Sequence, residues 1–100
     1  MQYSTFQKQS LEKLPPFNLD AERAILGAIL LDNSALFSAL DIFQPSDFYR
    51  EAHQKIFYAM MQVNARGEAI DLIVLRDELE RSKLLDDIGG PAYLVTLVDI

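Results

Sequence analysis

Apolar residues recur every three or four positions in five stretches of the chain, a spacing typical of helices with one buried face. The helices predicted from this pattern span about 19–31, 34–41, 50–66, 72–83 and 91–98. Asn18 and Asp71 are good N-caps for the first and fourth helices, and Pro91 suits the first position of the last one. Only Ile70–Leu75 reads ambiguously as helix or strand, so the pattern predicts an all-α domain.

The first predicted helix is apolar over most of its circumference, which favours a central position in the fold. Ala21, Ala24 and Ala28 form a stripe of small residues along it, and Gly27 adds to the stripe. A glycine inside a helix costs about 1 kcal/mol relative to alanine. We therefore expect a second helix to approach closely along this stripe.

Each of the other predicted helices also has an apolar face. The residues expected to point inward are Leu36, Phe37 and Leu40, then Ala52, Ile56, Phe57, Met60 and Val63, then Leu72, Leu75 and Leu79, and finally Tyr93, Leu94, Leu97 and Val98. The charged residues of the fourth helix lie mostly on its opposite side.

Composition and charge narrow the classes of partner. The 100 residues fit one small domain, and half of them are apolar, which is enough for a core. The formal net charge is −6, and the nine basic residues are scattered, so direct DNA or RNA binding is disfavoured and a protein partner is favoured. There is no cysteine, no signal-peptide pattern and no apolar run long enough to span a membrane, which predicts a soluble cytoplasmic protein.

Residues suited to catalysis or cofactor binding do not form a site in the sequence. A phosphate-binding loop requires a glycine directly before a lysine, and none of the four glycines has that position. Asp77–Glu78 and Asp86–Asp87 are adjacent pairs, which do not face each other on a helix, so we interpret them as solvated surface charge. We expect no catalytic, cofactor-binding or metal-binding residues in this chain.

Three other features could be functional or structural. His53 falls on the apolar face of the long helix, and we interpret it as a residue at the edge of the core that is hydrogen-bonded to the backbone or to a carboxylate such as Asp47. The aromatic group at Phe48, Tyr49, Phe57 and Tyr58 has few basic neighbours, which favours core packing over base stacking. Tyr93 follows a Gly-Gly-Pro turn and fits a core position and an exposed contact equally well.

Four blocks of residues, in order from Pro15 to the end of the chain, resemble the amino-terminal domain of the DnaB-type replicative DNA helicases. The blocks are Pro15-Pro16 with Ala21-Glu22 and Leu26-Gly27-Ala28; Asp47-Phe48-Tyr49 with His53-Gln54-Lys55-Ile56-Phe57; Gly67-Glu68 with Asp71-Leu72 and Leu79; and Ile88-Gly89-Gly90 with Tyr93-Leu94. Each block is weak alone, but their order and spacing together are specific.

The resemblance implies a compact orthogonal bundle of about five to six helices, the globular head of that domain. Residues 1–17 would be an N-terminal arm and residues 18–100 the head, while the helical hairpin and the RecA-like motor domain that follow in the family are absent from this chain. The parent protein would be an ATP-dependent 5′–3′ helicase that uses ATP and Mg²⁺ in its motor domain.

The resemblance also implies a non-catalytic assembly and protein-docking role during DNA replication. In the family, this part contributes to a collar of paired subunits on a hexameric ring and binds the helicase-interacting domain of primase, and a helicase loader is a further candidate partner. DNA would be contacted only through the motor domain. On this basis Tyr93 is the candidate partner-binding residue. The alternative is a stand-alone helical dimerisation or regulatory domain.

Overall fold

The computed structural model describes residues 18–99, which form five α-helices and one short 3-10 helix. The elements are α2 (Leu19–Leu31), α3 (Ala35–Leu40), η1 (Pro45–Asp47), α4 (Glu51–Ala65), α5 (Leu72–Arg81) and α6 (Gly90–Thr96). No strand occurs among these residues, so the all-α prediction is confirmed, and Ile70–Leu75 divides into a loop and the first turns of α5. The predicted arm, residues 1–17, and Ile100 lie outside the described part.

The predicted caps fix where two of the helices begin. The Asn18 side chain accepts a hydrogen bond from the backbone N–H of Ala21 (3.2 Å), and the Asp71 side chain accepts one from Val74 (2.8 Å). Each bond satisfies an N–H group that has no partner within its own helix. Gly67 follows α4 with a φ of +77°, a conformation that glycine adopts readily just past the end of a helix.

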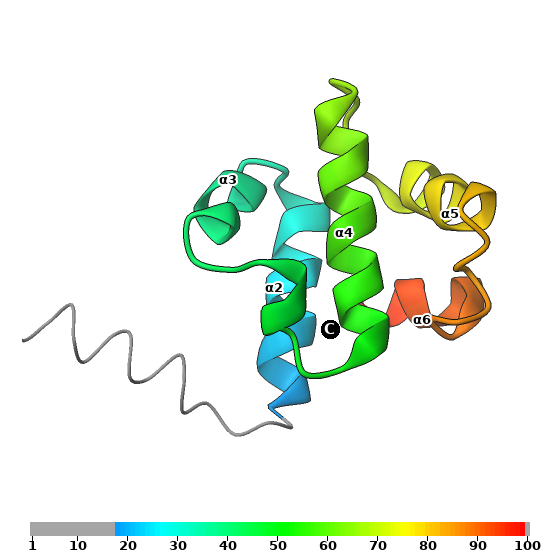
Figure 1. Ribbon diagram of the computed structural model, residues 1–100, viewed down its shortest axis with the longest axis horizontal. Coiled ribbons are helices and arrows are strands. Elements are labelled where there is room, and N and C mark those ends of the chain that lie inside the picture. Colours follow the sequence, from blue (N-terminus) through cyan, green and yellow to red (C-terminus); the bar gives the residue numbers. More distant parts are fainter. Residues whose placement is uncertain (1–17, 100) are drawn as a thin grey trace, which may run out of the picture.

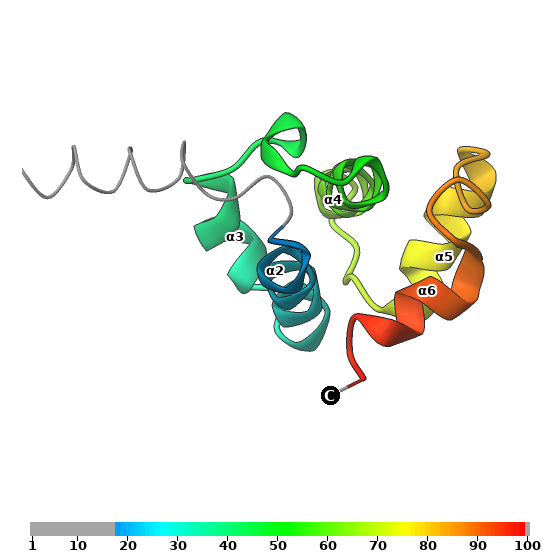
Figure 2. The same ribbon diagram turned by 90° about the horizontal axis from the view of Figure 1, so that it is seen from below.

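The central element is α4 rather than α2, so the prediction of a central first helix is wrong. Figures 1 and 2 show α4 between two pairs of helices, with α2 and α3 on one side and α5 and α6 on the other. Seven residues of the 15-residue α4 are buried, compared with three of the 13 in α2. A helix that contacts neighbours on both sides buries more of its surface than its sequence pattern alone indicates.

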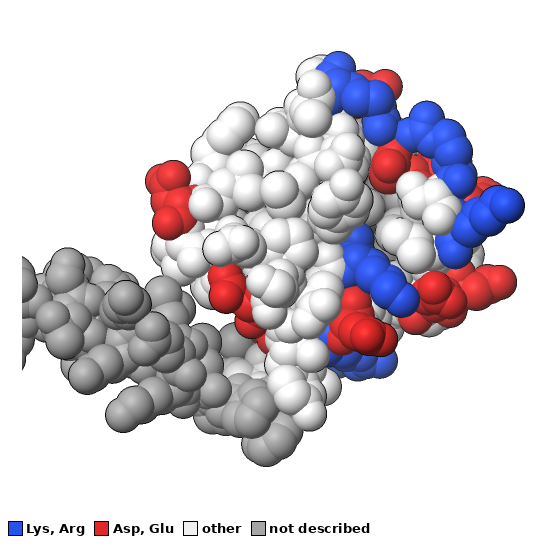
Figure 3. Space-filling model, in the orientation of Figure 1, with Lys and Arg blue, Asp and Glu red and all other residues white. Residues whose placement is uncertain are grey.

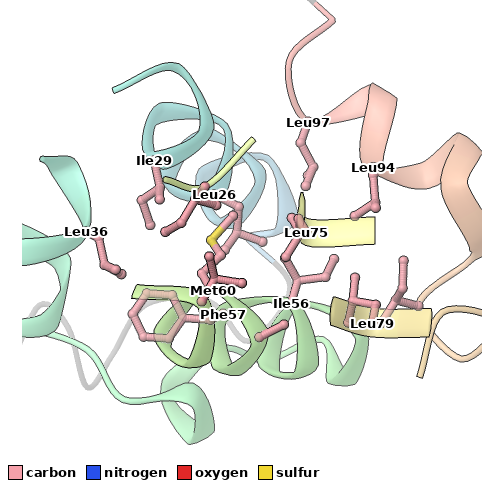
Figure 4. Close-up of a cluster of buried hydrophobic side chains, with 14 of the residues drawn as sticks. Leu26, Ile29, Leu36, Ile56, Phe57, Met60, Leu75, Leu79, Leu94 and Leu97 are labelled. Atoms are coloured by element: carbon pink, nitrogen blue, oxygen red, sulfur yellow. The ribbon is translucent and has the colours of Figure 1, made fainter. Parts of the chain in front are cut away.

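The core is one apolar cluster to which every α-helix contributes (Figure 4). Its fully buried members include Leu26 from α2, Phe57 from α4 and Leu75 from α5. Burying side chains of this size stabilises a fold by roughly 1.5–3 kcal/mol each before chain entropy is counted. All five residues predicted for the inner face of α4 are buried, which confirms that part of the pattern.

The small-residue stripe of α2 is only partly confirmed. Ala24 and Ala28 are exposed, so no helix packs along the alanines. Gly27 is buried, however, and a Cβ added there would collide with the backbone carbonyl oxygen of Leu97, the residue that ends α6. The predicted close approach is therefore real but is confined to one point of α2.

The prediction for the second helix fails for two of three residues. Leu36 is fully buried, but Phe37 is 59% exposed and Leu40 is 36% exposed, while Ala39 is buried instead. With only six residues, α3 packs along one narrow edge against α2, and the rest of its apolar surface faces outward.

Candidate functional site

Tyr93, the candidate partner-binding residue, lies in α6, where its ring is partly buried against the core. Its hydroxyl oxygen is 2.6 Å from Nε2 of His53, which belongs to α4. The two rings stack with centroids 5.8 Å apart and planes inclined by 25°. Tyr93 is thus neither fully buried nor freely exposed, and its polar end contacts the interior.

His53 is completely buried and is hydrogen-bonded through both ring nitrogens. Its Nδ1 lies 2.6 Å from Oε1 of Glu22 in α2, so the predicted hydrogen bond to a carboxylate is confirmed, but the carboxylate is that of Glu22 and not of Asp47. Asp47 instead accepts a hydrogen bond from the backbone N–H of Gln44 (2.7 Å) within the turn that contains η1. Glu22 is 31 residues away in the sequence, and helical spacing could not have indicated it.

Glu22 also organises the chain just before α4. Its carboxylate accepts hydrogen bonds from the backbone N–H groups of Tyr49 (2.6 Å) and Arg50 (3.4 Å). The Arg50 guanidinium lies 4.9 Å from the centre of the Tyr93 ring, in position for a cation–π interaction. Glu22, Arg50, His53 and Tyr93 together form what we call the His53 cluster, which joins α2, the start of α4 and α6.

The burial of His53 lowers the pKa of its imidazole below the ordinary value near 6.5. The hydrogen bond to Glu22 and its negative charge act in the opposite direction, while the positive charges of Arg50 and Arg23 add to the lowering. Burial outweighs the carboxylate, so the imidazole is neutral at neutral pH.

A second buried titratable side chain, this time an acid, lies beyond the other end of α4. Glu78 in α5 is buried and accepts hydrogen bonds from Arg66 (2.7 Å), which ends α4, and from Arg81. Burial acts to raise the pKa of the Glu78 carboxyl, but the two arginines outweigh it and the pKa is lowered. Arg66, Glu78 and Arg81 form what we call the Glu78 cluster.

The interpretation of Glu78 as solvated surface charge is therefore wrong. Arg81 is three residues along the same helix, a spacing at which side chains can pair, but nothing near Glu78 in the sequence indicated Arg66, which is 12 residues away. The exposed pair Asp86–Asp87 does fit that interpretation, and Asp87 lies 3.4 Å from Lys55.

The predicted core packing of the aromatic group is confirmed for two of its four residues. Phe48 and Phe57 are buried, whereas Tyr49 and Tyr58 are about half exposed.

The surface has two contrasting sides. Figure 3 shows most of the visible Lys and Arg side chains on the α5 side, interspersed with acidic ones, and a largely uncharged surface on the side of α2 and α3. The sequence between Arg23 and Arg50 has no basic residue. Large apolar side chains are exposed there, namely Leu31, Phe37, Leu40 and Ile42.

Two other kinds of site are absent from residues 18–99. No group of three or more His, Cys, Asp or Glu side chains there could hold a metal ion. None of the helices in the same range combines the length and the apolar character needed to cross a membrane.

Comparison with known proteins gives concordant matches. Residues 14–100 match the family model described as the DnaB-like helicase N terminal domain. The chain is 51% identical over 88 residues to the replicative DNA helicase DnaB of Geobacillus stearothermophilus and 46% identical over 88 residues to the replicative DNA helicase DnaC of Bacillus subtilis. Each match covers 88% of this chain and 19% of the relative, so the chain spans about a fifth of the length of these proteins.

A solved structure agrees with the sequence matches. The crystal structure of the N-terminal domain of DnaB helicase from Mycobacterium tuberculosis superimposes with a TM-score of 0.81 at 43% sequence identity, over 84% of this chain and 61% of the other. The resemblance stated from the four sequence blocks is thereby confirmed, and so is the fold that it implied. The chain belongs to the family of DnaB-like helicase N-terminal domains.

Proposed function

We propose that this chain is a non-catalytic assembly and protein-docking domain of a hexameric replicative DNA helicase. It would contribute to the N-terminal collar of the ring and bind primase during DNA replication. The observation that carries the proposal is the family match over residues 14–100, within which Tyr93 connects a surface helix to the buried His53.

The exposed surface supports a role in contacts between proteins. Leu31, Phe37 and Ile42 are each more than half exposed on the side of α2 and α3. Apolar side chains gathered on one side often mark a contact surface. Pairing of subunits within a collar would cover such residues, and a helicase loader is another candidate to do so.

Tyr93 supports the primase-docking part of the proposal. Tyrosine is common among binding hot spots because it offers a large amphipathic surface at a small cost in entropy. Its ring is held by the His53 cluster, so little further ordering would be needed when a partner binds. Leu94 and Leu97 support α6 from the core side.

The chemistry of the helicase would belong to other parts of the parent protein. ATP hydrolysis with Mg²⁺, 5′–3′ translocation and DNA binding are proposed for a motor domain outside this chain, and the cytoplasm is the proposed compartment. The net charge of −6 and the missing phosphate-binding loop support this division. An ATPase assay and a low-salt titration with labelled oligonucleotide should both be negative for the 100-residue chain. Micromolar DNA binding that weakens steeply with salt would contradict the proposal.

Calorimetric titration of full-length helicase with the helicase-interacting domain of primase tests the docking role. Tyr93→Ala should weaken binding by about tenfold or more if Tyr93 is a hot spot. Tyr58→Ala removes a half-exposed tyrosine from α4 and is the matched control, with binding expected to be unchanged. Wild-type affinity for Tyr93→Ala, with a reduced melting temperature, would assign Tyr93 to the core alone.

A further inference from the structure

Four large apolar side chains form an exposed face at the end of α2 and along α3. We call it the α2–α3 face, and its members, which are 36% to 68% exposed, are Leu31, Phe37, Leu40 and Ile42. Within α3, Phe37 and Leu40 are three residues apart and are therefore neighbours on the helix surface. Figure 3 shows this side of the molecule with few charges. The face is large enough and apolar enough to favour an occupant.

The few charges close to this face in the sequence are acidic and have no cationic partner. Asp32, Asp41 and Asp47 are exposed, and the segment 24–49 contains no Lys, Arg or Glu. None of the three aspartates is in an ion pair with another residue of the described range 18–99. An occupant that complements this face is therefore apolar and basic.

Most basic side chains of the described range are engaged elsewhere. Five of the seven Lys and Arg residues between 18 and 99 are in ion pairs with acids outside the segment 24–49. The other two are Arg50, whose guanidinium lies over the Tyr93 ring, and Lys83, which follows α5 on the other side of α4. The two remaining basic residues of the chain are Lys8 and Lys13, which belong to the arm.

The arm, residues 1–17, has the composition that the α2–α3 face requires. Phe6 and Leu11 provide large apolar side chains, and Lys8 and Lys13 outnumber the single acid, Glu12. Apolar and basic residues therefore alternate over a short stretch of the chain. The same combination does not occur in the segment 24–49, which has apolar residues and acids only.

The arm is also long enough to reach the face. The 13 residues of α2 make it roughly 20 Å long. The arm joins this helix at Asn18, whereas the face begins at Leu31, the last residue of α2. An extended chain spans about 3.3 Å per residue, so Leu11 can reach the end of α2 and Phe6 can reach α3. Pro15 disfavours a helical conformation for the residue before it, which suits an extended path.

We propose that residues 6–14 of the arm fold back over the α2–α3 face of the same chain. Phe6 and Leu11 would cover its apolar side chains, and Lys8 and Lys13 would lie near its aspartates. Burial of apolar surface and attraction between opposite charges both favour this contact. The inference goes beyond the proposed docking function because it needs no second protein. The arm would compete with any collar subunit or loader that binds the same face.

Paramagnetic relaxation in the 100-residue chain tests where the arm lies. The chain has no cysteine, so Gln9→Cys provides a single attachment point for a nitroxide label in the middle of the arm. The amide signals of the α2–α3 face should lose intensity. The signal of Ile73, which is 73% exposed in α5 on the other side of α4, should not. Full intensity at the α2–α3 face, or an equal loss at Ile73, would overturn the proposal.

Two variants of the labelled chain test the apolar part of the contact. Phe6→Ser combined with Leu11→Ser should lower the population of the docked arm by about tenfold or more, because both large apolar side chains are lost. The signals of the face should then recover. Gln2→Ser combined with Gln7→Ser is the matched control, which leaves every apolar residue in place and should show the loss seen in the parent. Recovery no greater in the first variant than in the control would contradict the proposal.

The charges of the arm are tested in the same labelled chain. Lys8→Glu combined with Lys13→Glu places acids beside Asp32 and Asp41, so the signals of the face should recover at low ionic strength. Glu12→Gln, which makes the arm more basic, should retain the loss of intensity. Salt should weaken the contact in the parent because it screens exposed charges. An unchanged loss in the double glutamate variant at low salt would count against the proposal.

A mixed sample distinguishes the chain's own arm from that of a second copy. Chains labelled with ¹⁵N but carrying no nitroxide are combined with nitroxide-labelled chains that contain no ¹⁵N. The face should keep its full intensity in this mixture, because each arm covers its own chain. A loss in the mixture equal to that in the doubly labelled chain would assign the face to the arm of another copy and overturn the proposal. No primase is present, so failure here leaves the docking role of Tyr93 to its own test.

Discussion

The two ends of α4 are each held by a buried titratable side chain, but the two are stabilised in different ways. Near the start of the helix, His53 is neutral and completely enclosed, and its partners are one carboxylate and one hydroxyl. Beyond the other end, Glu78 is charged, and its two arginine partners are 37% and 64% exposed. One cluster depends on directed hydrogen bonds around a completely buried ring, and the other on ion pairs between a buried carboxylate and two exposed arginines.

This difference indicates which of the two clusters is better suited to the proposed docking role. A buried, directional cluster can fix the orientation of a side chain such as Tyr93, whereas exposed ion pairs are screened by water and salt and give little positional control. We therefore propose that the His53 cluster supports the docking role and that the Glu78 cluster attaches α5 to the end of α4.

The substitution with the largest expected effect on stability disrupts the packing of α6 against α2. Gly27→Ala should destabilise the fold by roughly 1–3 kcal/mol, because the added Cβ collides with the Leu97 carbonyl group, which belongs to the backbone. Glycine to alanine within a helix would otherwise stabilise by about 1 kcal/mol, so the sign of the change is diagnostic. Chemical denaturation measures it.

Ala24→Leu is the matched control for that experiment. Ala24 is exposed on the same helix, so its replacement should change the free energy of unfolding by only about 0.5 kcal/mol or less. A large loss in Ala24→Leu together with a gain in Gly27→Ala would mean that α2 packs through its alanine stripe after all.

Acid should affect the two clusters in different ranges of pH. The pKa of His53 is lowered in the fold, so its contribution to stability is complete above pH 6.5 and is lost as the pH falls through the folded-state pKa. The pKa of Glu78 is also lowered, but its contribution is lost only below pH 4.5. Chemical denaturation at a series of pH values should show the loss of the His53 contribution below pH 6.5. The free energy of unfolding should fall there with a slope of at most about 1.4 kcal/mol per pH unit.

Replacing each side chain shows over which range of pH it contributes to stability. His53→Gln should remove the pH dependence that begins below pH 6.5, and Glu78→Gln should leave that range as it is in the wild type. A wild type whose stability is unchanged from about pH 7 to pH 5 would show that His53 titrates alike in the folded and unfolded chain.

Salt should affect only the Glu78 cluster, and this is the smallest effect. Glu78→Gln should cost about 1 kcal/mol at low ionic strength, reduced from the value for a dry ion pair because both arginines are substantially exposed. The cost should shrink toward 1 M salt, where the Debye length falls to about 3 Å and the charges of the exposed arginines are more strongly screened. An equal cost at low and high salt would mean that Glu78 acts through hydrogen bonds rather than through charge.

The sequence allowed the helices and the buried face of α4 to be predicted because both depend on local spacing. Asn18 and Asp71 were identifiable as caps for the same reason, since a cap bonds to an N–H three residues away. The exposure of Phe37 was not predictable, because it depends on how few residues of α3 contact α2.

The polar contacts of the candidate site depend on residues that are distant in the sequence. His53 was recognised as a hydrogen-bonded residue of an apolar face, but Glu22 is 31 residues before it and Tyr93 is 40 residues after it. Nothing in the composition or spacing associates them, because helix packing alone brings them together. Packing likewise brings Arg66 to Glu78, which the amphipathic pattern of α5 assigned to the solvent, whereas Arg81 is an i+3 neighbour on the same helix.

One measurement tests most directly whether docking and stability belong to different ends of α4. Tyr93→Ala and Glu78→Gln are each made in full-length helicase, and primase affinity and melting temperature are measured for both near pH 7.5. We predict that Tyr93→Ala weakens primase binding by about tenfold or more, whereas Glu78→Gln lowers the melting temperature and binds primase as the wild type does. Equal loss of affinity in both variants, or none in Tyr93→Ala, would contradict the proposed docking role of Tyr93.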